Sequence, residues 1–348
     1  MKKQRILPVL VLGSIICLTN FYPVTAQEIE RQLNIPFNNR RQQTIRDEAD
    51  LQIRLGAQEA RQRNPEKAIP FFLQALELYH EIGDIDAIGQ TYEYLAQVYI
   101  NLGRLKSAED VLRKRLSVAR DRENFLEQVF ALNNLGTLLL NTRDFQAADK
   151  LFNEAWEIAR SLESDEGIGL SLSNLGLLAA YQQDYNQAIK RYQAALTFRR
   201  QVPDPLGRAN TLNNLGDAYL ATHQFNQAID AYLVAEILAE ESLDLRNRYR
   251  ALIGLAESYN ALGLDRVALR RLDELFTLAR KNEDLSQQLS ALRLSAQIYS
   301  TQGNRLEAQR FYQEAIALAR LLQDTQLEAI LLNELSQVVY NFPYGIPY

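Results

Sequence analysis

A six-residue word that returns at a fixed interval constrains the fold of this chain more than any other feature. The word is ALNNLG at residues 131–136, SLSNLG at 171–176 and TLNNLG at 211–216. Its last position belongs to a column of small residues: Gly56, Ala96, Gly136, Gly176, Gly216, Ala256, Ala296 and Ser336. Further along each interval, a second column is always alanine: Ala68, Ala108, Ala148, Ala188, Ala228, Ala268 and Ala308. The period is about 40 residues, and self-similarity at such a period indicates a repeat architecture.

Apolar residues inside each unit recur at helical spacing. In the third unit they form two stripes, Leu132, Leu135, Gly136 and Leu139, then Phe145, Ala148, Phe152 and Ala155. Each unit is therefore predicted to be a helix, a short turn and a second helix. Glycine inside a helix is about 1 kcal/mol less favourable than alanine. A recurrent one predicts a place where two helices approach closely.

A third column predicts where the first helix of each unit begins. Its members are Thr44, Asp84, Asn124, Ser164, Asp204, Asp244, Asp284 and Asp324. All are good N-caps, because their side-chain oxygen can accept an otherwise unpaired backbone N–H. Glu127 and Gln287 lie three positions after their caps, which predicts a capping box at each. The first helix of the third unit is expected over residues 125–141.

The unit pattern resembles the tetratricopeptide repeat. The fifth unit carries it best, in Leu215, Gly216, Tyr219, Phe225, Ala228, Tyr232 and Ala235. The usual repeat has about 34 residues, whereas the unit here has about 40 residues. This longer form resembles the subfamily of kinesin light chain and several bacterial peptide sensors. The resemblance implies an all-α fold, a right-handed α-solenoid of stacked antiparallel helix pairs. It covers residues 44–340, as seven units and a C-terminal capping helix.

Three positions depart from the family pattern. Arg115 and Leu275 replace the late alanine of the second and sixth units, and Pro65 replaces the aromatic residue of the first. We expect less regular packing in those units.

The N-terminus has the pattern of a secretory signal peptide over residues 1–26. Three cationic residues precede an apolar run over residues 6–17, which is shorter than the roughly 20 residues that span a bilayer. The small residues of VTAQ predict cleavage before Gln27. An uncleaved anchor is one alternative. A lipoprotein signal is another, but the bulky pair Ile15 and Ile16 before Cys17 argues against it.

Cleavage would leave an exported protein, periplasmic or extracellular, with no membrane anchor. Loss of Lys2, Lys3 and Arg5 would change the formal net charge from −5 to −8. Neither value favours a nucleic-acid-binding surface. Loss of Cys17, the only cysteine, would remove any possibility of a disulfide.

Two segments lie outside the predicted array. Residues 27–43 are polar and are expected to form a flexible leader. Residues 341–348, NFPYGIPY, follow the last helix, and Pro343 cannot continue it. This aromatic tail is either a frayed end or a docking segment.

The sequence offers no constellation for catalysis. The two histidines, His80 and His223, do not have metal-ligand spacing. The stretch EGIG at residues 166–169 lacks the other elements of a phosphate-binding loop. We therefore expect no catalytic residue, no metal ligand and no cofactor.

The resemblance implies that the first helices line a concave groove. The candidate groove residues are Asn133, Asn134, Asn174, Asn210, Asn213, Asn214, Arg250 and Arg293. An amide offers two donors and an acceptor, which suits the backbone of an extended peptide. The alternative is that these amides bind the neighbouring helices of the array itself.

The carboxylate clamp of heat-shock-type relatives requires charged residues on successive first helices. Asn133, Ser173 and Asn213 carry no charge, and only Arg250 and Arg293 follow. Such a clamp is therefore not expected. The sequence favours an exported, non-catalytic scaffold that binds a protein or extended peptide. The alternative is an accessory or regulatory subunit of a separate enzyme or of a peptide-responsive signalling system.

Overall fold

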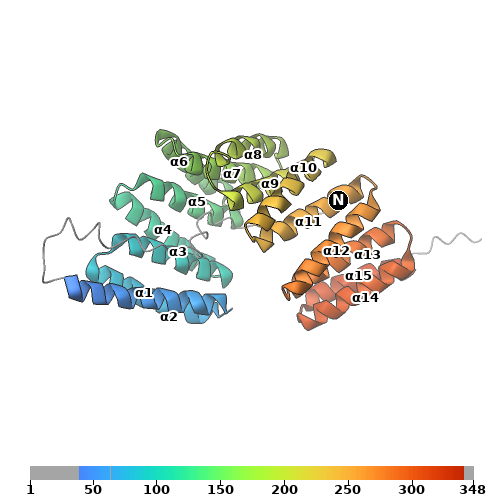
Figure 1. Cartoon of the computed structure of the whole chain (residues 1–348), viewed down its shortest axis with the longest axis horizontal. Coiled ribbons are helices and arrows are strands. Elements are labelled where there is room, and N and C mark those ends of the chain that lie inside the picture. The colour runs from blue at the N-terminus through green and yellow to red at the C-terminus, as the bar shows by residue number, and fades with distance from the viewer. Residues whose placement is uncertain (1–38, 63, 341–348) are drawn as a thin grey trace, which may run out of the picture. The chain divides into compact units, whose positions relative to one another are not determined.

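A computed structural model describes residues 39–62 and 64–340, and all regular structure among these residues is α-helical. The predicted signal peptide, most of the predicted leader and the tail lie outside the described residues. The helices are α1 Asn39–Arg61, α2 Pro65–Ile82, α3 Ile85–Asn101, α4 Leu105–Asp121, α5 Phe125–Asn141, α6 Phe145–Ser161, α7 Asp165–Tyr181, α8 Tyr185–Arg199, α9 Pro205–Ala221, α10 Phe225–Glu241, α11 Leu245–Ala261, α12 Asp265–Lys281, α13 Leu285–Thr301, α14 Arg305–Leu321 and α15 Thr325–Tyr340. Figure 1 shows them in chain order.

The chain divides into two compact units, residues 1–178 and 179–348, and the division falls inside α7. Each unit is described by itself below. In unit 1, α1 packs against α2, α3 against α4 and α5 against α6; in unit 2, the same pairing joins α9 to α10, α11 to α12 and α13 to α14. Most second helices also pack against the first helix of the next repeat, as α2 does against α3 and α10 against α11. These stacked pairs confirm the predicted all-α solenoid.

The column of small residues forms sockets for large side chains. A Cβ added to Gly56 would lie 2.7 Å from the ring of Phe72, one added to Gly136 2.5 Å from Phe152, and one added to Gly216 2.6 Å from Tyr232. In each pair the ring comes from the second helix of the same repeat. The predicted close approach of the two helices is thus confirmed at these glycines.

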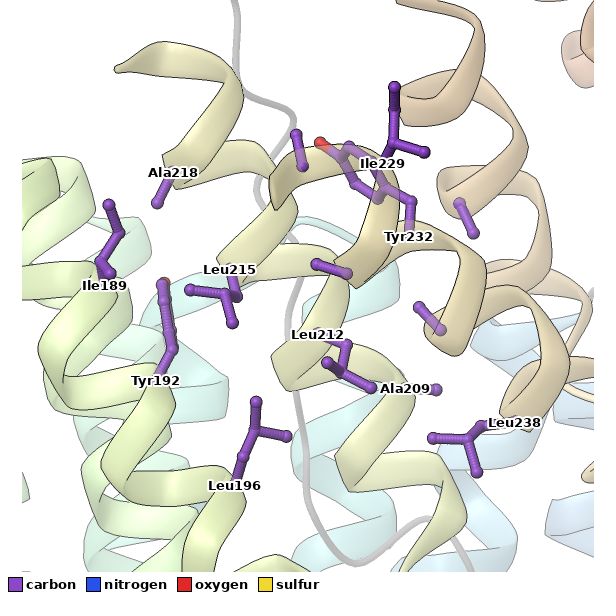
Figure 2. Packing of buried hydrophobic residues seen from close by; sticks show 14 of the residues in the cluster. Ile189, Tyr192, Leu196, Ala209, Leu212, Leu215, Ala218, Ile229, Tyr232 and Leu238 are labelled. Carbon is purple, nitrogen blue, oxygen red and sulfur yellow. The ribbon is translucent and has the colours of Figure 1, made fainter. Parts of the chain in front are cut away.

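The core runs between the helix pairs. Figure 2 shows part of it in unit 2, where Tyr192 of α8 and Leu215 of α9 belong to one buried cluster with Tyr232 of α10. The alanine column lies in the same layer, and all seven of its members are fully buried. Alanine is required there because a larger side chain would separate helices that already touch.

Seven of the eight predicted N-caps are confirmed. In each, the cap side chain accepts from the backbone N–H three positions later: Asp84, Asn124, Ser164, Asp204, Asp244, Asp284 and Asp324. Thr44 is the exception. It lies inside α1, and its hydroxyl donates to the carbonyl of Arg40 at 2.8 Å. The predicted leader over residues 27–43 is therefore wrong for residues 39–43, which are helical.

The predicted capping boxes are wrong. The carboxylate of Glu127 accepts from Arg115 instead, at 3.0 Å, and Gln287 Oε1 is buried without a hydrogen-bond partner among the described residues. The backbone N–H groups of the caps Asn124 and Asp284 donate to the carbonyls of Ala119 and Ala279, in the helix before. That bond already satisfies each cap N–H, so nothing remains for the side chain three positions later.

Arg115 explains how one departure from the family pattern fits the fold. Its side chain is 5% exposed, and Nη2 lies 3.0 Å from Oε2 of Glu93 on α3 and 3.0 Å from Oε2 of Glu127 on α5. An arginine in place of alanine thus joins three consecutive helices through charge. Leu275 is fully buried in the core of unit 2, and Pro65 occupies the first position of α2, where proline is favoured.

No helix among the described residues combines the length and the apolar character that a membrane span requires.

Candidate binding face of the first helices

The first helices of successive repeats contact one another within each unit. Such contacts join α1 to α3 in unit 1, and α9 to α11 and α11 to α13 in unit 2. We call the surface that these helices and α5, α7 and α15 form in their own units the first-helix face. All eight predicted groove residues lie on its helices, and the six asparagines are each 5% exposed or less.

In unit 1 the predicted asparagines bind each other across the repeats. Asn174 Nδ2 on α7 donates to Asn133 Oδ1 on α5 at 2.8 Å. Asn133 Nδ2 donates in turn to Ser171 Oγ at 2.9 Å and to the carbonyl of Val129 at 2.8 Å. Asn134 Nδ2 donates to Glu93 Oε1 on α3 at 3.2 Å. These bonds connect α3, α5 and α7 along one side of the unit.

In unit 2 the guanidinium of Arg250 gathers the polar groups of α9. It donates to Asn210 Oδ1 at 3.2 Å, to Asn214 Oδ1 at 2.8 Å and to Asp217 Oδ2 at 2.8 Å. The three acceptors lie at i, i+4 and i+7, one stripe of a helix. The other oxygen of Asp217 accepts from the hydroxyl of Tyr232 at 2.6 Å. The cluster thus ties α9, α10 and α11 together.

Two amide atoms of α9 have no hydrogen-bond partner among the described residues. They are Nδ2 of Asn210, a donor, and Oδ1 of Asn213, an acceptor. The amide nitrogen of Asn213 is occupied, because it donates to the carbonyl and the Oδ1 of Asn247 on α11, at 3.0 and 3.1 Å. A buried polar atom without a partner is unfavourable by about 1–3 kcal/mol.

Glu257 adds a titratable group to the same stripe of α11 as Arg250. The residue as a whole is exposed, but protein atoms surround its carboxyl group. The resulting loss of hydration, followed by repulsion from Asp217, raises the pKa of Glu257 to about 7. The first-helix face of unit 2 therefore holds a carboxyl group that changes its charge near neutral pH.

Arg293 is not joined to the other predicted residues. Its guanidinium forms a bidentate ion pair with Glu334 of α15. Nε lies 3.0 Å from Oε2, and Nη2 contacts Oε1. The pair links α13 to α15 across one repeat.

The sequence analysis did not predict five residues that form hydrogen bonds or ion pairs with the predicted groove residues. They are Glu93, Ser171, Asp217, Asn247 and Glu334. Helical periodicity could have found Asp217, which lies two turns after Asn210 on the same helix. The others belong to neighbouring repeats, and sequence spacing alone does not show which side chains meet. The hydrogen bonds show that the amides connect neighbouring helices; a role in ligand binding stays a prediction.

The described residues contain no group of three side chains that could hold a metal ion. Neither His80 nor His223 lies within a first helix: His80 is an exposed residue near the end of α2, and His223 lies in the turn between α9 and α10.

Comparison with known families identifies the repeat. A model of the tetratricopeptide repeat matches residues 47–121, 127–201 and 167–241, and a second model of the same description matches residues 290–320. The first model alone covers more than half of the chain. No curated protein matches the sequence.

Several solved structures share the fold. A Rap protein complexed with Competence and Sporulation Factor has a TM-score of 0.58 at 19% identity, over 86% of this chain and 79% of that one. The Rap conjugation gene regulator of plasmid pLS20, in complex with the Phr* peptide, has a TM-score of 0.59 at 15% identity, over 87% and 81%. Aspartyl phosphate phosphatase F from Bacillus subtilis has a TM-score of 0.56 at 14% identity, over 92% and 76%. At these identities the likeness shows the fold alone.

Proposed function

Because the chain belongs to the tetratricopeptide-repeat family, we propose that it is an exported, non-catalytic scaffold whose first-helix face binds an extended segment of another protein or a peptide. Repeat solenoids present long surfaces of this kind, and stacking of units sets their extent. Two of the similar solved structures are complexes, one with Competence and Sporulation Factor and one with a Phr* peptide. These complexes support the proposal by analogy.

The observation that carries the proposal is the set of amides on the first helices, on α5 and α7 in unit 1 and on α9 in unit 2. An extended peptide presents an N–H and a C=O at every residue, about 3.3 Å apart along the strand. Asparagine can meet both groups. On α9 the unpaired donor of Asn210 and the unpaired acceptor of Asn213 lie about one turn apart. Both atoms are buried, so a ligand can pair with them only after the side chains that cover them move; it would then recover the free energy that the unpaired atoms lose.

The absence of catalysis is part of the proposal. It is supported by the position of both histidines outside the first helices and by the hydrogen bonds that occupy polar residues of the first-helix face. One structural neighbour is named as a phosphatase, so an accessory or regulatory role beside an enzyme or a peptide-responsive signalling system is the second candidate.

Asn210→Ala should weaken binding of the partner about 5- to 150-fold. The variant removes an unpaired donor, and a lost hydrogen bond of this kind is worth about 1–3 kcal/mol. The stability of the fold should change little, because Arg250 retains its hydrogen bonds to Asn214 and Asp217. The partner would first be captured from the exported fraction on the immobilised full chain and identified by mass spectrometry. Calorimetry with the identified segment would then compare the variants.

Lys150→Ala and Lys190→Ala are matched controls, since both side chains are exposed on second helices. Their affinities should equal that of the wild type. Normal binding by a folded Asn210→Ala variant would contradict the proposed site and would place the partner elsewhere on the chain.

Export gives a separate prediction. The native exported protein should begin at Gln27, because VTAQ supplies the small residues that signal peptidase requires. Intact-mass measurement of the protein from the producing cell would decide this. A chain that retains Met1, or that carries an acylated cysteine, would overturn the proposed export route.

A further inference from the structure

The exposed side of α10 differs from that of the next second helix, α12. Val234 and Ile237 of α10 are 43% and 55% exposed. At the same positions of its repeat, α12 carries the polar residues Glu274 and Thr277. Scattered single apolar side chains are common on protein surfaces. Two that lie one turn apart on a helix form a continuous apolar strip, and such a strip with a polar rim is one feature of an interaction surface.

Carboxylates lie at both ends of this strip. α10 contains four acidic residues and neither lysine nor arginine. Asp230 lies one turn before Val234, and Glu241 lies one turn after Ile237, so all four share one side of the helix. Both of these carboxylates are exposed, and neither forms an ion pair with a described residue. Glu241 also lies at the negative end of the helix dipole, where a carboxylate is unfavourable.

The neighbouring helix α12 carries the opposite charge. It lies beside α10, since Nη1 of Arg271 is 3.7 Å from Oε2 of Glu236. Both helices pack against α11, and short turns join α11 to each, so α10 and α12 run in the same direction. α12 contains five cationic residues. Two of them, Arg270 and Lys281, are exposed and form no ion pair with a described residue.

These charges are placed so that the surface complements itself. Arg270 and Lys281 occupy the positions of their repeat that Asp230 and Glu241 occupy in theirs. In each helix the two charges are about three turns, or 16 Å, apart along the axis. A second copy that is rotated by half a turn about an axis between α10 and α12 places its α12, antiparallel, on α10. Each carboxylate then meets a cation.

We propose that two copies of the chain associate through this surface as a symmetric dimer, in which α10 of each copy packs against α12 of the other. Asp230 pairs with Lys281 of the second copy, and Glu241 pairs with Arg270 of the second copy. The two-fold axis repeats both ion pairs. The apolar strip of α10 lies between these pairs, where the second copy covers it.

A second copy fits this surface better than a basic segment of another protein does. A basic segment would pair with the carboxylates of α10, but it would meet the cations of α12 as like charges. A second copy compensates the charges of both helices at once. Exposed ion pairs are individually weak and are screened by salt, so we expect a transient dimer. Because the contact involves second helices, it leaves the first-helix face to the proposed ligand.

Sedimentation velocity of the full chain tests the dimer. The wild type should shift from monomer to dimer as the protein concentration rises from about 1 to 100 µM. Sodium chloride raised from about 50 to 500 mM should weaken the association at least about 10-fold. Ile237→Ser should also weaken it about 10-fold, because the centre of the contact loses its apolar side chain. Lys150→Glu, which reverses an exposed charge of α6, should leave it unchanged.

Charge reversal is the sharper test, because it allows a rescue. The double variant Asp230→Lys, Glu241→Lys and the double variant Arg270→Glu, Lys281→Glu should each associate at least about 10-fold more weakly than the wild type, since like charges then face each other. An equimolar mixture of the two should dimerise about as well as the wild type, because each reversed helix then faces the other. The circular dichroism of both should match the wild type, since all four side chains are exposed.

Four results would overturn the proposal. The wild type could stay monomeric at every concentration. The reversed variants could dimerise as the wild type does, which would place the dimer contact on another surface. The mixture could stay monomeric while the wild type dimerises, which would show that these residues do not pair in the proposed register. A monomeric wild type could bind a lysine-rich peptide that the Asp230→Lys, Glu241→Lys variant does not bind, which would make a basic segment the occupant.

Discussion

Gly254→Ala should lower the free energy of unfolding by about 3 kcal/mol. A Cβ at this position would lie 2.2 Å from Cζ and 2.4 Å from Cε1 of the Tyr232 ring. The Tyr232 ring cannot move away, because it also packs against Gly216 of α9. In addition, the Tyr232 hydroxyl donates a hydrogen bond to Asp217. Overpacking of a filled core is unfavourable by about 1–3 kcal/mol, and here the backbones of α9 and α11 would have to separate.

Gly89→Ala is the matched control, since Gly89 also lies inside a first helix. Its added Cβ would meet only Val118, at 3.8 Å, an ordinary contact. This variant should therefore be more stable than the wild type by about 0.5–1 kcal/mol. Urea unfolding monitored by hydrogen exchange would report the stability of each unit separately. A loss of stability in both variants, or in neither, would contradict the assignment of Gly254 to a close contact.

Arg115→Ala should destabilise unit 1 by about 3 kcal/mol, although alanine is the residue that the family pattern places there. Removing one partner of a buried ion pair leaves the other charge uncompensated, which is unfavourable by about 3–5 kcal/mol. We expect the lower end of this range of destabilisation, because Glu127 is half exposed and its carboxylate can be hydrated once Arg115 is removed. Glu93 is more enclosed and would keep its charge beside the new cavity. Denaturant unfolding of the single variant would give the magnitude.

The double variant Arg115→Ala, Glu93→Gln identifies the cause of that loss. If the uncompensated carboxylate is responsible, the second change should restore about 1 kcal/mol or more. A double variant that is no more stable than the single one would assign the loss to the cavity alone, and Arg115 would then be a space-filling residue.

The repeat pattern predicts most of the fold because its signals are local. The small residue at Gly216, the cap at Asp204 and the alanine at Ala228 each act within one helix pair. Backbone hydrogen bonds and caps depend on residues three or four positions apart, so the sequence contains both partners. Seven N-caps and the close helix approach at three glycines were predictable for this reason.

Thr44 shows where a local signal fails. A good cap residue marks a helix start only if the residues before it leave the helix, and residues 39–43 do not. This part of α1 has contacts in the tertiary structure: Arg41 lies 3.3 Å from Glu81 of α2, and Arg46 lies 3.2 Å from Asp84 before α3. The sequence near Thr44 contains neither partner.

The amides of the first-helix face show the same division between local and distant information. Their positions follow from the repeat, so the sequence by itself determined that Asn133 and Asn213 occupy one position of the first helices and that Asn174 occupies the next, with Asn134 and Asn214. Which group each amide binds was decided only by the tertiary structure, which brings Asn174 to Asn133 and Asn247 to Asn213 from the next repeat. The physical reason is that an amide bonds equally well to a peptide and to a neighbouring helix. Its choice depends on distances between side chains of different repeats, and only packing sets these distances.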